Sequence, residues 1–158
     1  LFADGTEVSW QASGGDETIT LTSLGTGVGR EGDKHDFGAT REEFLTLMLK
    51  WGVGTAPNDG EAVSLYWAWS RSATAGTDNP GGLTGADADV TDDTDALQCV
   101  YVGNMNLHST GSVTRVKYFV IPMYWRYGFP VVINRTSQDG SSTAGDFEVA
   151  AKPTKRQF

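Results

Sequence analysis

Residues 61–69, with the sequence EAVSLYWAW, constrain the fold of this chain more than any other stretch. Read with a period of two, Val63, Leu65, Trp67 and Trp69 share one face, and the other face carries small residues and Tyr66. A helix of 3.6 residues per turn would scatter these bulky side chains around its axis. Two indoles can each bury on the order of 200 Å². The segment is therefore predicted to be a central strand of a β-sandwich, with its second face in solvent or in shallow contact with a neighbour.

Similar alternation predicts seven further strands, at residues 6–11, 17–24, 43–51, 96–104, 112–121, 131–133 and 147–151. The first two are expected to pair as a hairpin. A turn at residues 53–60 is expected to join the strand at 43–51 to the central strand as a second hairpin.

Two of these predicted strands have apolar residues that allow more than one interpretation. Residues 43–51 could begin a helix, because leucine and methionine favour helices, but the apolar residues at positions 45, 47, 49 and 51 are spaced by two and favour a strand. In residues 112–121, Val116, Tyr118 and Val120 are expected to face inward, and Arg115 and Lys117 are expected to face water.

Eight strands, two long glycine-rich connections at residues 25–40 and 70–95, and no βαβ crossover predict an all-β fold. The expected architecture is an antiparallel, eight-stranded jelly-roll-like sandwich. An immunoglobulin-like sandwich is the alternative, although its Cys–Trp–Cys pattern is missing. The length of 158 residues suits a single domain, 1–158, with extended tails at about residues 1–5 and 152–158. Connections this long are usually functional or poorly ordered.

Composition narrows the classes of partner. The net charge of −8 argues against direct binding to nucleic acid. No apolar window of about 20 residues predicts a membrane span, and the start of the chain does not resemble a signal peptide. The single cysteine, Cys99, excludes an internal disulfide framework, and its alternation with Leu97 and Tyr101 predicts a small buried residue.

No pattern of catalytic residues stands out, so the sequence predicts no enzyme and no cofactor. Residues 27–32 match G-x-G-x-x-G, but no helix follows them to bind a phosphate, and a loop is expected. His35 and His108 lack the spacing of a zinc site and are expected in exposed loops.

Five aspartates gather in the second long connection, at Asp87, Asp89, Asp92, Asp93 and Asp95. Carboxylates at such spacing can supply oxygen ligands to Ca²⁺, although the glycine and the final glutamate of an EF-hand loop are absent. A solvated acidic loop is the favoured interpretation, and a calcium site is the alternative.

An aromatic segment between two prolines is the first candidate interface. It contains Tyr124, Trp125, Arg126, Tyr127 and Phe129. Tyrosine, tryptophan and arginine dominate the energetics of protein interfaces. An aromatic plug at one end of the sandwich explains the same residues equally well, and a platform for sugar stacking is a third possibility.

The basic C-terminal segment is the second candidate interface, through Lys152, Lys155 and Arg156. On an acidic protein, these charges could meet the aspartate-rich connection of a neighbouring subunit. Exposed ion pairs contribute only about 0–1 kcal/mol each, so aromatic residues would have to supply most of the affinity.

Three separated blocks of sequence look familiar. They are LYWAWS, SATAGTDNPGG and TGADA between residues 65 and 88, GTEVSW with SGGD between residues 5 and 16, and RYGFPVV at residues 126–132. Together they resemble a family of small structural proteins encoded among the virion genes of tailed bacteriophages. Some small jelly-roll proteins of this kind act as capsid cement proteins, and others belong to tails. The resemblance supplies no catalytic residues.

The resemblance implies a capsid decoration (cement) protein that is assembled in the host cytoplasm and binds the major capsid protein on the outer capsid surface, as a homotrimer. An acidic protein suits that surface, because the phosphates of packaged DNA would repel it. The alternative is a carbohydrate-binding module of a tail or fibre. Such a module would use exposed tryptophan and tyrosine side chains, with Ca²⁺ held by the aspartate-rich connection.

Overall fold

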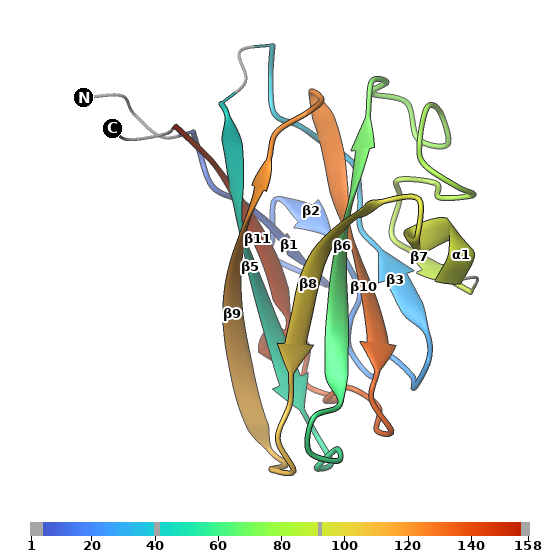
Figure 1. The fold of residues 1–158 in the computed structure, drawn as a ribbon, viewed down its shortest axis with the longest axis vertical. Coiled ribbons are helices and arrows are strands. Elements are labelled where there is room, and N and C mark those ends of the chain that lie inside the picture. Colours follow the sequence, from blue (N-terminus) through green and yellow to red (C-terminus); the bar gives the residue numbers. More distant parts are fainter. Residues whose placement is uncertain (1–4, 40–41, 92, 156–158) are drawn as a thin grey trace.

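Two β-sheets pack face to face in the computed structural model, which describes residues 5–39, 42–91 and 93–155 (Figure 1). The first, sheet A, has the strand order β2-β1-β11-β5-β9. In that order its strands are Glu17–Thr18, Val8–Gln11, Glu148–Thr154, Phe44–Val53 and Val113–Pro122.

The second sheet, sheet B, has the strand order β7-β3-β10-β6-β8, and the short strand β4 also pairs with β10. Its strands are Ala88–Val90, Gly29–Glu31, Tyr127–Arg135, Ala62–Ser70 and Val100–Asn106, with β4 at His35–Asp36. The only helices among the described residues are two short ones, α1 at Asp93–Ala96 and η1 at Ala144–Asp146. The all-β sandwich is therefore confirmed.

The two sheets contain eleven strands, where the sequence predicts eight. Strands β3, β4 and β7 lie within the glycine-rich connections, and they are too short for their alternation to stand out. The expected strand at residues 96–104 begins later, at Val100, because α1 occupies the start of that segment. None of the described helices is long and apolar enough to cross a membrane.

Both expected hairpins are wrong. Strand β2 has only two residues and pairs with β1 in parallel. Strands β5 and β6 belong to different sheets, so the turn between them carries the chain across the sandwich. Local alternation predicts that a strand forms, but the choice of its partner depends on contacts far along the chain.

Alternation does identify the core correctly. The segment at 43–51 is a strand, and its inward residues Leu45, Leu47, Leu49 and Trp51 are at most 1% exposed. Trp67 on β6 is fully buried. Its ring meets that of Trp10 on β1 edge to face, with centroids 5.5 Å apart. Aromatic pairs in this geometry add to the stability gained by burial.

The outer faces of the two sheets differ. The second long connection folds over the outer face of sheet B and forms a second hydrophobic cluster there. Tyr66, predicted to face solvent or a shallow contact, is only 6% exposed beneath it. We call residues 71–99 the covering segment; in Figure 1 it includes β7 and α1 on the right-hand side of the molecule. The outer face of sheet A has no such cover among the described residues.

Candidate interaction surface

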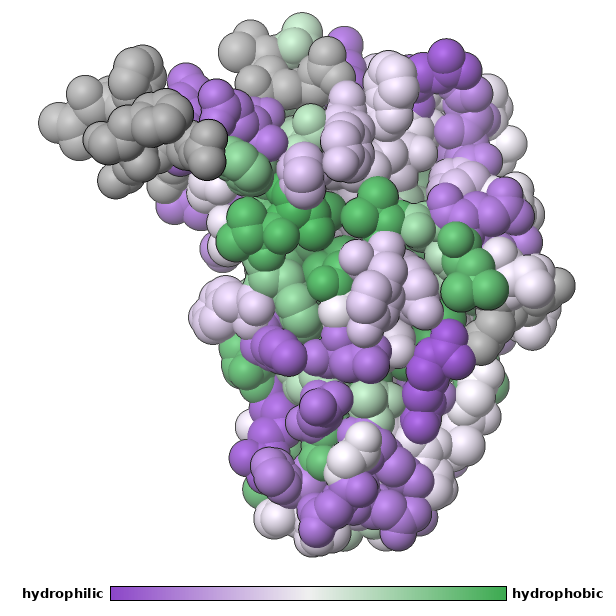
Figure 2. Space-filling model, viewed as in Figure 1, coloured by the Kyte–Doolittle hydropathy of each residue, from purple (hydrophilic) through white to green (hydrophobic). Residues whose placement is uncertain are grey.

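All the exposed large hydrophobic side chains of the described residues lie within one stretch, residues 97–125. This stretch contains β8 and β9, which lie side by side where the edges of the two sheets meet (Figure 1). Figure 2 shows hydrophobic residues gathered over β8 and the upper part of β9. We call these residues the β8–β9 surface: Leu97, Tyr101, Val116, Tyr118, Val120, Tyr124 and Trp125.

Strand β9 faces the opposite way from the prediction. Val116, Tyr118 and Val120 point outward and are 50%, 67% and 64% exposed. The odd-numbered residues point toward the other sheet, and Ile121 is buried there. The apolar residues at 118–121 made both orientations possible, and the packing of Ile121 and Phe119 against the core decides between them.

Lys117 can lie on the inner row because β9 is at the edge of the sandwich. Its amino group donates a hydrogen bond of 2.7 Å to the carbonyl oxygen of Asn104 on β8, and its Nζ lies 5.3 Å from the ring centroid of Phe119. A long basic side chain can cover apolar groups with its stem and still place its charge at the rim. Lys117 is thus exposed to water, as predicted, although it lies on the inner row, and Arg115 on the same row is partly buried.

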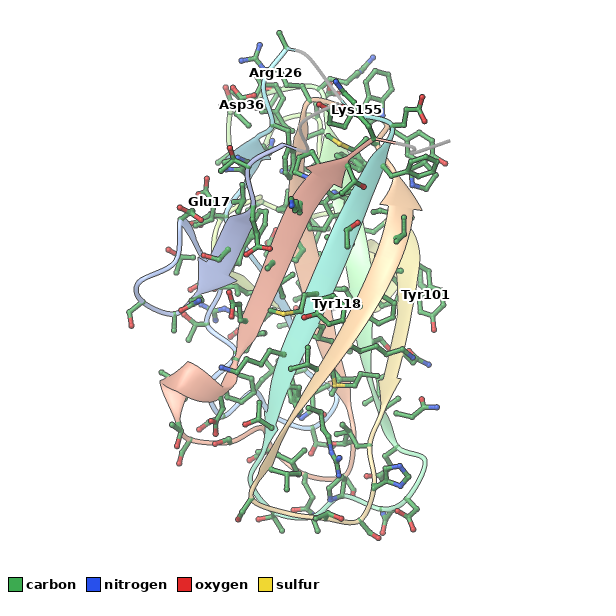
Figure 3. All side chains as sticks on the ribbon, turned by 90° about the vertical axis from the view of Figure 1, so that its left-hand side faces the viewer. Glu17, Asp36, Tyr101, Tyr118, Arg126 and Lys155 are labelled. Atoms are coloured by element: carbon green, nitrogen blue, oxygen red, sulfur yellow. The ribbon has the colours of Figure 1, made fainter. Side chains whose placement is uncertain are left out.

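The neighbouring strand adds one apolar side chain, Met48, to this surface, between Thr46 and Lys50. The register of β5 and β9 places Thr46, Met48 and Lys50 beside Val120, Tyr118 and Val116, respectively. Thr46, Met48 and Lys50 are partly exposed. Figure 3 looks onto this face and shows Tyr118 on it, with Tyr101 projecting from β8 at the adjacent edge. Isolated exposed apolar residues are ordinary, whereas a contiguous apolar patch marks an interaction site.

The aromatic segment after β9 continues this surface at one end of the sandwich. Tyr124 is 53% exposed and Trp125 is 46% exposed. The guanidinium carbon of Arg71 lies 5.7 Å from the ring centroid of Trp125, and the ring of Tyr124 meets that of the buried Trp69 edge to face. These contacts hold both rings in place while leaving area for a partner.

The rest of that predicted interface is not uniformly accessible. Arg126 is exposed and forms two hydrogen bonds of 2.6 Å with the carboxylate of Asp36. This pairing holds the pKa of Asp36 below its ordinary value. Tyr127 begins β10 and is partly buried. Phe129 is fully buried in the second hydrophobic cluster, so its assignment to an interface is wrong.

The predicted basic tail is partly strand. Lys152 lies in β11, which continues to Thr154, so these residues belong to sheet A and not to a tail. The amino group of Lys155 lies 3.5 Å from the carboxylate of Glu42. Arg156 lies outside the described residues. Contact between this segment and the acidic connection of a second subunit stays a prediction.

Two charged residues from sheet B and the strand connection next to it hold down the covering segment. The carboxylate of Glu31, 2% exposed, accepts hydrogen bonds from the backbone N–H and hydroxyl of Thr84 and from the N–H of Gly85. The amino group of Lys34 lies within 3.1 Å of four acceptor oxygens: the hydroxyl oxygen of Ser70 and the carbonyl oxygens of residues 72, 74 and 77. The predicted functional or poorly ordered loop is thus anchored through polar contacts, of which the bond from Gly85 to Glu31 is buried and most of the others are partly buried.

The described aspartates of the predicted calcium site make contacts within the protein. Arg30 donates hydrogen bonds of 2.6 Å to both Asp87 and Asp89. Burial tends to raise the pKa of Asp87, but the hydrogen bonds from Arg30 and Thr20 outweigh it and hold that pKa below its ordinary value. Asp95 accepts a hydrogen bond from the N–H of Gly82.

The two remaining aspartates of the predicted calcium site supply no described metal-ligand geometry. Asp92 lies outside the described residues, and Asp93 is described only as the start of α1. Across the described ranges, no group of three or more histidine, cysteine, aspartate or glutamate side chains could hold a metal ion.

The histidines and the cysteine have separate local roles. His35 was expected in an exposed loop, but it lies on β4, with Nδ1 2.7 Å from the carboxylate of Glu17 and its ring against Phe37. His108 is exposed, as predicted. Cys99 is partly buried against the second hydrophobic cluster, and burial raises its pKa to about 12.

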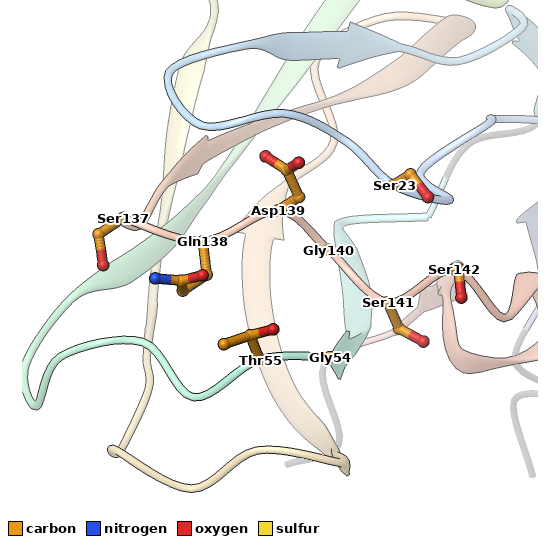
Figure 4. Close-up of a pocket in the computed structure, with 9 residues that line it drawn as sticks. All are labelled: Ser23, Gly54, Thr55, Ser137, Gln138, Asp139, Gly140, Ser141 and Ser142. Carbon is orange, nitrogen blue, oxygen red and sulfur yellow. The ribbon is translucent and has the colours of Figure 1, made fainter.

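A polar depression of about 470 Å³ lies between the turns at residues 54–55 and 137–142 (Figure 4). Its lining is mostly hydroxyl, amide and backbone groups. Asp139, its single carboxylate, accepts a hydrogen bond from the N–H of Thr26. The lining contains no aromatic ring on which a sugar could stack.

The exposure of the outer row of β9 was not predicted from the sequence. Pro122 at the end of the strand was a usable signal, because proline in a sheet is confined mainly to edges, strand starts and bulges. An edge strand can place apolar residues on both faces without being buried.

No protein-family model and no curated protein sequence matches this chain.

Proposed function

We propose that this protein is a non-enzymatic structural protein of a bacteriophage virion, and that it decorates the outer capsid surface by binding the major capsid protein. The single observation that carries the proposal is the β8–β9 surface, which concentrates the exposed large hydrophobic side chains of the described residues. The blocks of sequence that resemble small virion proteins supply the identity of the partner.

We also infer that the sandwich is an eight-stranded jelly roll with three short additions. Four of its antiparallel pairs are nested along the chain: β1 with β11, β3 with β10, β5 with β9, and β6 with β8. Such nesting results when one long hairpin folds over into two sheets, as in a jelly roll. Strands β2, β4 and β7 then extend or cover the edges.

The chemistry of the β8–β9 surface supports binding to a protein. Exposed Tyr118, Tyr124 and Trp125 are residue types that supply much of the binding energy in protein interfaces. Two charged residues lie at the margin of these rings: Lys117 on the inner row of β9, and Arg71 beside Trp125. An apolar centre with a charged rim is the usual composition of such an interface.

Immunogold labelling of the phage that encodes this chain tests the location. Label over the head is expected, and label confined to the tail would contradict the proposal.

Binding to capsids purified without this protein tests the surface. Replacing Tyr118 by serine should weaken binding at least about tenfold if the side chain is an interface anchor. Replacing the exposed Ser142, on the polar depression, by alanine is the control and should leave binding unchanged.

The proposed oligomer is a homotrimer, as the resemblance implies. A closed ring needs two different patches on each subunit. The aromatic end formed by Tyr124 and Trp125 is the proposed first patch. Changing Trp125 to alanine should therefore dissociate the trimer at low concentration, as measured by light scattering, whereas deleting residues 155–158, which follow β11, should weaken it modestly and in a salt-dependent way. A trimer unaffected by the Trp125 change would place the contact elsewhere.

A carbohydrate-binding tail or fibre module is the second candidate. Trp125 favours it, because its exposed ring lies beside an ion pair between Arg71 and Asp78, and sugars bind where an aromatic face adjoins charged hydrogen-bonding groups. A glycan array separates the two functions: saccharide binding that is lost on changing Trp125 would favour the tail module.

A further inference from the structure

The open edge of β9 is a long and regular strand edge, on which the outward-facing row of residues 116, 118 and 120 carries no charge. It pairs with β5 over ten consecutive residues without a bulge, and no second strand among the described residues pairs with β9 in its sheet. Proteins usually protect such an edge with a bulge, a proline, charged side chains or a short strand. Of these, β9 has Pro122 at its end and Arg115 and Lys117 on its inner row. The edge strand of the other sheet, β8, is shorter and has a register shift opposite Leu65 and Tyr66.

The direction of the free backbone groups follows from the ladder. Met123 donates its N–H to the carbonyl of Glu43 over 3.0 Å, in the register of the β5–β9 pair. Hydrogen-bonded pairs alternate along an antiparallel ladder, so the odd-numbered residues of β9 bond to β5. The even-numbered residues turn their N–H and C=O groups to the open side. The alternation ends at Ser112, where φ is positive and the N–H bonds to Gly54.

The residues with free backbone groups are therefore also the residues with exposed apolar side chains. Val116, Tyr118 and Val120 each turn an N–H and a C=O to the open edge of sheet A and an apolar side chain to its outer face. A second strand placed here would gain hydrogen bonds and side-chain contacts together. Pro122, which has no N–H, ends the row.

We propose that this edge pairs with the same edge of a second copy of the chain, antiparallel, about a two-fold axis at Tyr118. In this register Tyr118 lies opposite its own counterpart, and Val116 lies opposite Val120 of the other copy. Each of these pairs exchanges two backbone hydrogen bonds. The two copies of sheet A then form one continuous sheet with an uninterrupted apolar row on its outer face.

Neighbouring registers fit less well. An axis at Lys117 places two ammonium groups opposite each other, and like charges at such positions are destabilising. An axis at Phe119 places Pro122, which cannot donate a hydrogen bond, opposite Val116, whereas an axis at Tyr118 places it opposite Thr114, at the end of the row. With the axis at Tyr118, Lys117 lies opposite Phe119 and Arg115 lies opposite Ile121, so no like charges meet.

This pairing does not depend on the proposed virion function. It is isologous, whereas a ring uses heterologous contacts, so it could join two rings across a two-fold axis. Loss of the pairing would not move the protein from head to tail, and a tail location would not abolish the pairing.

Disulfide trapping of the full chain tests the register, in a Cys99→Ser background so that only introduced cysteines react. Tyr118→Cys should form a disulfide-linked dimer, because residues paired at the axis have Cα atoms about 5.5 Å apart, within the range of a disulfide. Val116→Cys alone and Val120→Cys alone should not cross-link, and an equimolar mixture of the two should. No cross-link from Tyr118→Cys, or equally strong cross-linking of Val116→Cys alone, would overturn the proposal.

Amide exchange of the unmodified protein provides the second measurement and needs no variant. The amides of residues 116, 118 and 120 should be protected at high concentration and lose that protection on dilution, together with a fall in mass by sedimentation. The amide of residue 119, bonded to β5 in either state, is the internal control. A monomer at every concentration, or protection of the amides of residues 116, 118 and 120 that does not change on dilution, would contradict the pairing.

Discussion

The two outer faces of this sandwich carry apolar residues, but only one of them is covered by its own chain. Sheet B presents Tyr66, Phe129 and Val131, and the covering segment buries all three. Sheet A presents Val116, Tyr118 and Val120, which remain exposed. Covering one face required anchors such as Glu31 and Lys34. The difference shows that the chain can bury an outer face where it has the contacts to do so, and that the β9 side is left for another molecule.

The largest expected effect compares one aromatic side chain on each outer face. Phe129→Ala should lower the free energy of unfolding by about 3–5 kcal/mol, because it leaves a cavity under the covering segment. Tyr118→Ala should change it by no more than about 0.5 kcal/mol in the monomer, because the ring is 67% exposed. Denaturant unfolding of both variants measures this. Equal losses would mean that the two faces are alike.

The next effect removes an anchor of the covering segment. Glu31→Ala leaves the N–H groups of Thr84 and Gly85 without their acceptor, which should cost about 1–3 kcal/mol for each group left buried and unsatisfied. Amide exchange should accelerate across residues 72–99 and stay unchanged in β9. Glu148→Ala, on the outer face of sheet A, is the control. Unchanged exchange at residues 84 and 85 would show that Glu31 is no anchor.

Acid is expected to destabilise the covered outer face of sheet B before the exposed outer face of sheet A. The pKa of Asp87 lies below its ordinary value of 3.8 in the folded protein, so its ion pair with Arg30 stabilises the fold above that value. This stabilisation is lost as the pH falls through the lowered pKa. Limited proteolysis should therefore cut residues 71–99 faster at about pH 3 than at pH 7. Asp87→Asn should be cut faster already at pH 7 and respond less to acid; an unchanged acid response would exclude Asp87 as the titrating group.

The smallest effect is a labelling rate and leaves stability unchanged. Burial, with the nearby charges of Glu31 and Asp95, raises the pKa of Cys99 to about 12, so little thiolate forms at neutral pH. A thiol reagent should modify Cys99 at least about 100-fold more slowly than a cysteine at Val116 in the Cys99→Ser protein. Similar rates would show that the covering segment opens readily in the native state.

The sequence by itself determined the class of fold and most of its core. Alternation at residues 43–51 and 63–69 identified β5 and β6 and their buried leucines and tryptophans, because a period of two is a local property of an extended chain. The residue types of the aromatic segment also identified Tyr124 and Trp125, which are exposed and are expected to contact a partner.

Only the tertiary structure decided which strands pair, which face of β9 is buried and which aromatic residues are accessible. Residues 118–121 are apolar on both faces, so their own sequence cannot distinguish inside from outside, and a shift of one residue exchanges the two faces. Phe129 looks like its exposed neighbours in sequence, yet it is buried because residues more than thirty positions earlier fold over it. These outcomes depend on contacts between distant segments, whose free energies no local pattern contains.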